Sequence, residues 1–216
     1  MKIENNILAE GLKNVLFISG GAYGGKTTMA KMLQQKYGFV RYREGDMWDG
    51  HMAYARPTSQ PAMCHDRSLD WSGFYSQPAD RYHQWLDTIV REEAEMAIID
   101  LIKLSHSQRV VADVMIPPDM LKEIAGYRQV VLLFAFVEMK RAHYFDREDK
   151  RPVFNHIMSM PNPEKTLENV LNALTYEGEK EIQAFYSSGF KCIMRSPDRS
   201  VGETFNEIER HFGLLS

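Results

Sequence analysis

The sequence contains little cysteine, no long apolar run and no excess of basic residues. Two of its 216 residues are cysteines, Cys64 and Cys192, and their separation matches no metal-ligand spacing. The longest uncharged apolar run, Val130 to Val137, is too short to span a bilayer. We therefore expect neither a disulfide-stabilised fold nor an integral membrane protein.

Charge and the first residues give further exclusions. The 26 basic and 29 acidic residues leave a net charge of -3, so nothing in the bulk charge favours binding to nucleic acid. Residues 1–6 contain no apolar segment of the kind that a secretory signal has. We expect a cytoplasmic protein with no nucleic-acid or membrane partner, and the sequence leaves its oligomeric state open.

Short apolar runs alternate with segments of helical periodicity along the whole chain. This alternation indicates βαβ units and a parallel sheet covered by helices on both faces, an α/β fold class. We expect strands at 15–19, 39–43, 109–114, 130–137 and 190–194. We expect helices at 27–37, 80–104, 167–185 and 201–211, a short helix after Pro117, and irregular segments at 47–78 and 152–163. The length favours one domain over residues 1–216.

A glycine-rich segment follows the first expected strand and opens the first expected helix. It fits the pattern G-x-x-x-x-G-K-[ST] with Gly20, Gly21, Ala22, Tyr23, Gly24, Gly25, Lys26 and Thr27, and Thr28 comes next. Glycines let the backbone N–H groups point at phosphate oxygens, and the helix N-terminus adds partial positive charge. The pattern predicts that Lys26 reaches the β- and γ-phosphates and that the Thr27 hydroxyl binds Mg²⁺.

Asp113 lies at the end of the third expected strand. A carboxylate in that place is suited to holding Mg²⁺ beside a phosphate-binding loop, directly or through water. The other interpretation is a solvated aspartate at a strand end.

These features together resemble the nucleoside monophosphate kinase and shikimate kinase-like group of P-loop kinases. The resemblance rests on the loop at 20–28, on Asp46, on Asp113 and on the basic segment after the fourth strand. It implies a three-layer P-loop NTPase fold with strand order 2-3-1-4-5, a substrate-binding insertion at 47–80 and a lid at 138–160. It also implies ATP and Mg²⁺. One departure is Tyr23, which stands where those kinases usually have glycine.

Asp46 and Asp49 follow the second expected strand, at the edge where ligands bind in open α/β sheets. In shikimate kinase-like members, an aspartate in the place of Asp46 contacts the acceptor hydroxyl and can take its proton. A carboxylate there also suits a hydroxyl acceptor better than an anionic one. The alternative is that Asp46 belongs to a turn after Gly45.

Aromatic and arginine side chains are interleaved in the insertion. They could hold a planar anionic substrate, or the aromatic rings could form a small core of their own. The aromatic residues are Trp48, Tyr54, Trp71, Phe74 and Tyr75, and the arginines are Arg56, Arg67 and Arg81.

Arginines are also concentrated in the expected lid. Arg147 and Arg151, more than Arg141, are candidates for stabilising charge on the transferring phosphoryl group. The alternative is a solvated helix with charge pairs such as Asp146 with Lys150.

The sequence therefore predicts an ATP- and Mg²⁺-dependent small-molecule kinase that phosphorylates a hydroxyl acceptor. The expected catalytic residues are Lys26, Asp46, Arg147 and Arg151, and the expected metal ligands are Thr27 and Asp113. A nucleoside or nucleotide kinase and a nucleotide-binding switch with slow hydrolysis are the alternatives. The guanine-reading motif N-K-x-D and zinc-hydrolase or esterase motifs do not occur in the sequence.

Overall fold

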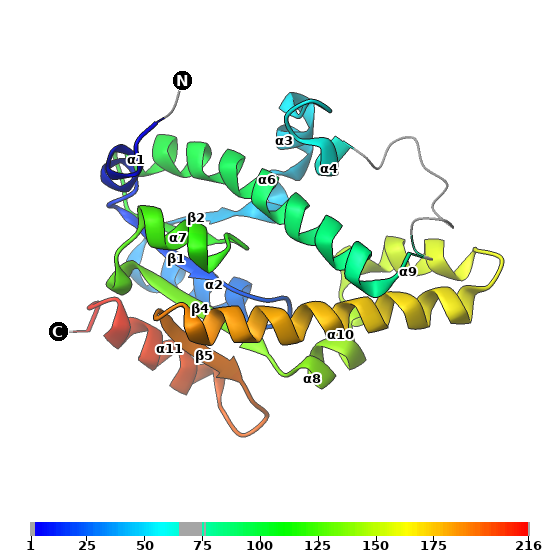
Figure 1. The fold of residues 1–216 in the computed structure, drawn as a ribbon. Helices are drawn as coiled ribbons and strands as arrows, with labels where there is room; N and C mark the ends of the chain where they lie inside the picture. The colour runs from blue at the N-terminus through cyan, green and yellow to red at the C-terminus, as the bar shows by residue number, and fades with distance from the viewer. Residues whose placement is uncertain (1–2, 65–74, 76, 216) are drawn as a thin grey trace.

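A computed structural model describes residues 3–64, 75 and 77–215. Its centre is a five-stranded sheet in the order β2-β3-β1-β4-β5, in which every neighbouring pair is parallel (Figure 1). The strands are β1 (Val15–Ser19), β2 (Val40–Arg43), β3 (Val110–Asp113), β4 (Val130–Ala135) and β5 (Lys191–Arg195).

Helices connect the strands and cover the sheet. The α-helices in the described residues are α1 (Asn5–Gly11), α2 (Lys26–Tyr37), α3 (Trp48–Tyr54), α4 (Pro61–Cys64), α6 (Ala79–Ser105), α7 (Pro118–Ile124), α8 (Val137–His143), α9 (Arg151–Met158), α10 (Pro163–Ser187) and α11 (Val201–His211). Short 3-10 turns lie at Glu44–Asp46, Tyr127–Gln129, Tyr144–Asp146 and Glu148–Lys150.

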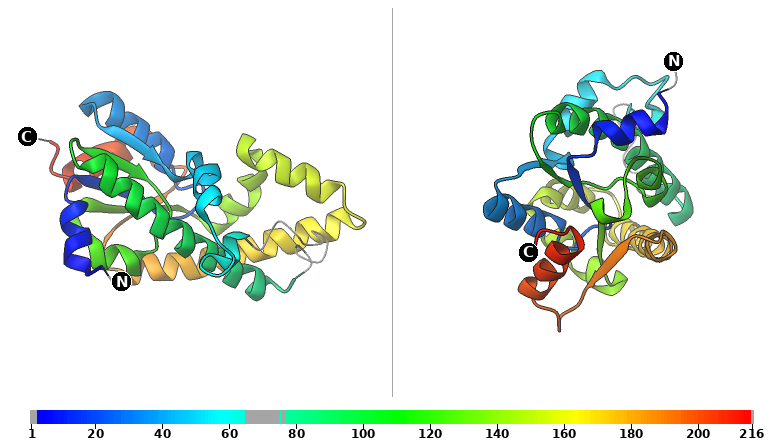
Figure 2. Two further views of the ribbon diagram at one scale, coloured as in Figure 1. Left: turned by 90° about the horizontal axis from the view of Figure 1, so that it is seen from above. Right: turned by 90° about the vertical axis from the view of Figure 1, so that its left-hand side faces the viewer.

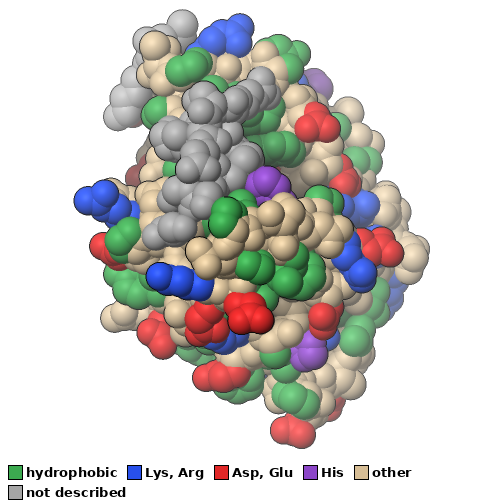
Figure 3. Space-filling model, turned by 90° about the vertical axis from the view of Figure 1, so that its right-hand side faces the viewer, with side chains coloured by type: hydrophobic (Ala, Val, Ile, Leu, Met, Phe, Trp, Pro, Cys, Tyr) green, Lys and Arg blue, Asp and Glu red, His purple; other side chains and the backbone are tan. Residues whose placement is uncertain are grey.

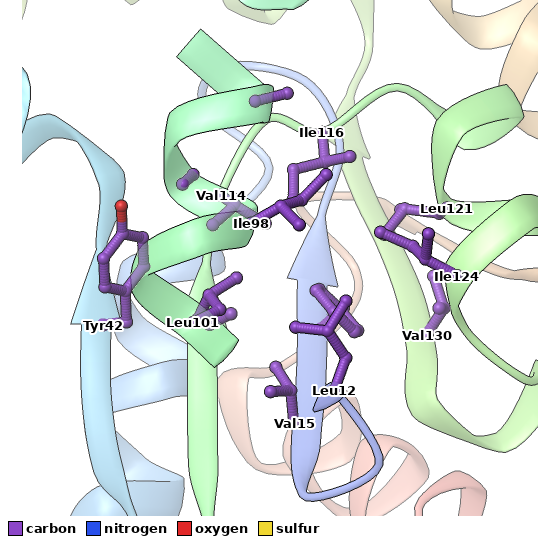
Figure 4. Packing of buried hydrophobic residues seen from close by; sticks show 14 of the residues in the cluster. Leu12, Val15, Tyr42, Ile98, Leu101, Val114, Ile116, Leu121, Ile124 and Val130 are labelled. Carbon is purple, nitrogen blue, oxygen red and sulfur yellow. The ribbon is translucent and has the colours of Figure 1, made fainter. Parts of the chain in front are cut away.

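The alternation of side chains along the strands produces two cores. In β1, Val15 and Phe17 face one side of the sheet and belong to a core with residues of α6 and α7. Figure 4 shows Val15 on this side together with Leu101 of α6 and Ile124 of α7. Leu16 and Ile18 face the other side and pack with α2 and α11. Because successive strand side chains point to opposite faces, one apolar run can supply both cores. The result is the three-layer arrangement that the sequence predicts.

Two long helices extend past the sheet. The N-terminal parts of α6 and α10 continue beyond its edge and meet α9 (Figures 1 and 2). This helical extension has a third core, to which Tyr75, Tyr82, Ile157 and Leu174 contribute. The extension stands beside the carboxyl ends of the strands, where the glycine-rich loop also lies.

The predicted strands and main helices are confirmed within one or two residues at most ends. Both segments that were predicted to be irregular contain helix. Residues 152–163 are mostly helix, because Pro152 occupies the first turn of α9 and Pro163 the first turn of α10, where proline is tolerated. Residues 47–78 contain α3 and α4.

Among the described residues, the surface seen in Figure 3 carries both acidic and basic side chains. Within the part of the chain that the structure describes, no helix combines the length and the apolar composition that a membrane span needs.

Candidate active site

The loop between β1 and α2 lies tightly against the end of β4. A Cβ atom on Gly20 would lie 2.2 Å from the carbonyl oxygen of Leu133, and one on Gly24 would lie 2.5 Å from the same oxygen. Any side chain at either position would displace the loop from the strand. Glycine at these two positions therefore allows the loop to close at the edge of the sheet.

Lys26 is the first residue of α2, and its side chain folds back over the loop. Its Nζ donates hydrogen bonds to the carbonyl oxygens of Gly20 and Gly21 at 2.8 and 2.9 Å. Burial lowers the pKa of Lys26, and the carboxylates of Asp113 and Glu44 partly offset that effect. The ammonium group is thus held at the centre of the loop, where a phosphate would bind.

The next residue, Thr27, contacts the end of β3. Its Oγ1 donates a 2.6 Å hydrogen bond to Oδ2 of Asp113, which is 5% exposed. A hydroxyl and a carboxylate oxygen are both ligands that Mg²⁺ prefers. The two predicted metal ligands are adjacent and fit that ion.

A cavity of about 520 Å³ opens over the loop. Its walls come from the loop, from the 3-10 turn after β2, from α3 and α6, from the end of β3 and from the segment after β4. The polar and charged side chains that line it are Lys26, Thr27, Thr28, Arg43, Glu44, Glu93, Asp113, Lys140, Arg147, Lys150 and Arg195. The apolar and aromatic ones include Trp48, Leu86, Ile89, Val90, Tyr144 and Leu174.

Glu44 supplies a carboxylate to this cavity from the end of β2. Its Oε2 accepts a 2.8 Å hydrogen bond from the backbone N–H of Met115. Burial raises the pKa of Glu44 to about 7; the Met115 bond and Lys26 oppose the rise, and Glu93 and Asp113 add to it. A carboxylate with a pKa near neutrality is suited to accepting a proton. The sequence pattern alone does not distinguish Glu44 as a site residue.

Asp46, which the sequence analysis placed at the acceptor, does not line the cavity. Its exposed carboxylate accepts a 2.7 Å hydrogen bond from Arg43 Nη1 and lies 4.0 Å from Arg41. The 3-10 turn at Glu44–Asp46 directs Glu44 to the cavity and Asp46 to the surface. Asp49 is also exposed and also lies outside the cavity lining. The role predicted for Asp46 thus gains no support from its position.

The predicted lid contributes Arg147 to the cavity but not Arg151, which is exposed. Two basic residues that the sequence analysis did not select, Lys140 and Lys150, line it as well. Lys140 is buried and pairs with Glu181 at 3.2 Å.

Arg141 faces α10 instead. Its guanidinium donates hydrogen bonds to Glu168, Asn172 and Thr175. It is a contact between two helices and does not line the cavity.

Tyr23 connects the loop to two other segments. Its ring stacks on His143 of α8, with the two ring centroids 5.6 Å apart. The guanidinium of Arg195, the last residue of β5, lies 4.6 Å from the centroid of the Tyr23 ring. Arg195 also donates a hydrogen bond to the Tyr23 carbonyl oxygen at 3.1 Å. Among the described non-glycine residues, only Tyr23 has a positive φ, of 67°. It therefore keeps a backbone conformation that glycine adopts more easily.

Of the aromatic residues and arginines named in the insertion, some line the cavity and others lie elsewhere. Trp48 lines the cavity, Tyr75 is buried in the core of the helical extension, and Tyr54 is exposed. Arg56 and Arg81 do not line the cavity. Arg67, Trp71 and Phe74 lie outside the described residues.

A buried polar network stands behind the cavity. His51 of α3 forms hydrogen bonds through Nδ1 to Glu93 Oε1 at 2.7 Å and through Nε2 to Asp100 Oδ2 at 2.9 Å. Glu93 is 3% exposed and lines the cavity. Sequence reasoning missed this network, because contacts between α3 and α6 are set by tertiary packing. The signal that was present is the spacing of Leu86, Ile89, Val90 and Glu93, which lie on one helix face.

Comparisons with known proteins add little to these observations. No family model matches the chain, and no curated protein matches it. Among solved structures, the chain is similar to the shikimate kinase from Acinetobacter baumannii in complex with shikimate, with 16% sequence identity and a TM-score of 0.42. That match covers 93% of this chain and 91% of the other.

The chain's own topology defines its class. The strand order β2-β3-β1-β4-β5 and the glycine-rich loop between β1 and α2 are those of a P-loop NTPase-like α/β fold. A segment after β4 that bears Arg147 and Lys150 lines the same cavity as the loop.

Proposed function

We propose that the protein is a Mg²⁺- and ATP-dependent small-molecule kinase that transfers the γ-phosphoryl group to a hydroxyl acceptor. One observation carries the proposal. A single cavity brings together the phosphate-loop residue Lys26, the Thr27–Asp113 pair and, on another wall, the carboxylate of Glu44. Nucleotide binding alone requires the first two features but gives no role to a carboxylate with a pKa of about 7.

Each group has a task in such a transfer. The loop amides and Lys26 bind the phosphates, and Thr27 and Asp113 hold the metal ion. The ion, when bound, neutralises charge on the phosphate oxygens. Arg147 and Lys150 stabilise negative charge on the transferring group from the lid side.

Glu44 accepts the proton of the acceptor hydroxyl in this proposal, the role first expected of Asp46. Its hydrogen bond from the Met115 N–H fixes the carboxylate, and its raised pKa makes proton transfer at neutral pH favourable. Residues 47–80 and 138–160 are proposed to enclose the acceptor and the phosphates within one domain.

Formation of ADP that depends on an acceptor tests this function. The purified chain is given Mg²⁺ and ATP, alone and with each of a panel of sugars, polyols, amino alcohols, hydroxy acids and nucleosides, and ADP and phosphorylated product are both measured. A kinase gives product with at least one acceptor, and Lys26→Ala gives none. ATP binding without product from any acceptor would instead support a nucleotide-binding switch.

A further inference from the structure

Within the part of the chain that the structure describes, one carboxylate oxygen of Glu93 has no partner. Its Oε1 bonds to His51, whereas Oε2 is buried and has no hydrogen-bond partner among the described residues. A buried carboxylate oxygen without a donor destabilises the folded state, because it loses its hydrogen bonds to water and gains none in return. Since Glu93 also lines the cavity, a molecule bound there can supply the missing donor.

The neighbouring His51 bonds to two carboxylates, those of Glu93 and Asp100. Both ring nitrogens of His51 face carboxylates, which is the arrangement of a doubly protonated ring. Burial alone would lower the pKa of His51, and the hydrogen bonds to Asp100 and Glu93 together raise it above its ordinary value. Asp100 also pairs with the exposed Lys103 at 3.4 Å, so the cations of this network are shared between two carboxylates and leave only Oε2 of Glu93 as an open acceptor among the described residues of the network. Burial raises the pKa of Glu93, and its hydrogen bond with His51 opposes that rise.

The rest of this wall is apolar or acidic. Leu86, Ile89 and Val90 precede Glu93 on the same face of α6, and Glu44 adds a second carboxylate. Arg43 lines the cavity too, but its guanidinium is bonded to Asp46. The other basic lining residues belong to the phosphate loop, to the segment after β4 and to the end of β5. An anionic group would be repelled at the Glu93 wall, and a cationic one would be attracted.

We propose that Glu93 is the acceptor-binding residue of the cavity and that the acceptor is a hydroxylated compound bearing a protonated amine. The ammonium group donates a hydrogen bond to Glu93 Oε2, and the apolar face of α6 packs on the carbon skeleton. Glu44 then faces the hydroxyl. This inference rests on the proposed kinase function and names its substrate class.

Matched pairs of acceptors test the inference. Glucosamine is compared with glucose, serinol with glycerol, and glycerate serves as the anionic probe, each with Mg²⁺ and ATP. We expect kcat/KM to be at least about tenfold higher for each amine than for its neutral counterpart, in keeping with a charge-assisted hydrogen bond. Glycerate is expected to be the poorest acceptor.

Substitutions on α6 test whether the preference for amine acceptors depends on Glu93. Glu93→Gln should reduce the amine-to-neutral ratio to near one, mainly through KM, while ATP affinity stays within about twofold. Glu95→Gln removes an equal charge from an exposed position on the same helix and should leave the ratio unchanged. Because Glu93→Gln disturbs a buried network, its melting temperature is measured, and Glu93→Asp, which keeps the charge, should retain part of the preference.

The outcomes separate the two proposals. Phosphorylation of neutral or anionic probes without preference for amines would overturn the amine assignment and leave the kinase function standing. An amine preference that persists in Glu93→Gln would overturn the role of Glu93. Lack of acceptor-dependent ADP with every probe, together with lack of a thermal shift by any amine, would overturn both.

Discussion

Thr27 and Asp113 are joined by a 2.6 Å hydrogen bond between residues 86 positions apart in the chain. The bond connects the first turn of α2 to the end of β3, directly beneath the cavity. It brings a hydroxyl and a buried carboxylate to one point beside Lys26. The site proposed for phosphate and metal is built on this contact.

Asp113→Asn should weaken Mg²⁺-dependent binding of ATP. The amide keeps the size of the side chain but loses the negative charge, so we expect the affinity for ATP to fall about 10- to 100-fold with Mg²⁺. In EDTA, affinity should change little. Isothermal titration of wild type and variant in both buffers measures the difference, and an equal loss with and without Mg²⁺ would argue against a metal role.

Glu44→Gln and Asp46→Asn should differ sharply. Glu44 lines the cavity, so its replacement should lower kcat by about 10²- to 10⁴-fold, the usual range for a general base. Asp46 is bonded to Arg43 at the surface, so Asp46→Asn should keep most of the activity. Initial rates at saturating ATP compare the two. A severe loss in Asp46→Asn with normal activity in Glu44→Gln would restore the role first expected of Asp46.

The rate of transfer should rise with pH through about 7. Glu44 acts as a base only when it is deprotonated, and its pKa is raised to about 7. A plot of kcat/KM against pH from 5.5 to 8.5 should therefore show an acidic limb with a midpoint near 7 in the wild type. The residual activity of Glu44→Gln should show no acidic limb. If the limb persists in this variant, the titrating group is not Glu44.

The free energy of unfolding of the ligand-free protein should fall with rising pH as Glu44 loses its proton. Because the pKa of Glu44 in the folded chain is raised from 4.5 to about 7, protonation favours the folded state. Its contribution is fully present below about pH 4.5 and is lost as the pH rises through 7. As the pH rises from 5 to 8, the melting temperature of Glu44→Gln should therefore rise relative to that of the wild type, because glutamine does not titrate. A difference independent of pH would contradict this.

Tyr23→Gly and Tyr23→Ala should differ in stability. Both lose the ring contacts with Arg195 and His143, but only glycine relieves the positive φ of 67°. We expect Tyr23→Gly to be more stable than Tyr23→Ala by about 1 kcal/mol. Urea unfolding measures both. Equal stability would show that the loop relaxes in the alanine variant.

The sequence allowed most of the fold to be predicted, together with the residues of the candidate site that lie on the loop and at the end of β3. Apolar runs identify buried strands directly, and the spacing from Gly20 to Thr27 specifies the loop and its partner strand. Pro152 and Pro163 were misread because a proline in the first turn of a helix resembles one in a loop. Whether Glu44 or Asp46 points into the cavity depends on how the 3-10 turn at Glu44–Asp46 is oriented, and the residue pattern does not determine that orientation.

Glu93 could not be predicted for a different reason. Its partner His51 is 42 residues away, and the crossing of α3 and α6 alone brings them together. In the sequence it is one of several acidic residues on a charged helix. Its burial and its unpaired oxygen become visible only in the packed structure.

Thermal unfolding with and without Mg²⁺ and ATP tests the central claim, nucleotide binding at the Gly20 to Thr28 loop, most directly. At 100 times its dissociation constant, a ligand adds about 2.7 kcal/mol to the free energy of unfolding. The account predicts a rise in Tm for wild type with Mg²⁺ and ATP, and a much smaller rise for Lys26→Ala. Absence of a shift in the wild type, or an equal shift in Lys26→Ala, would contradict it.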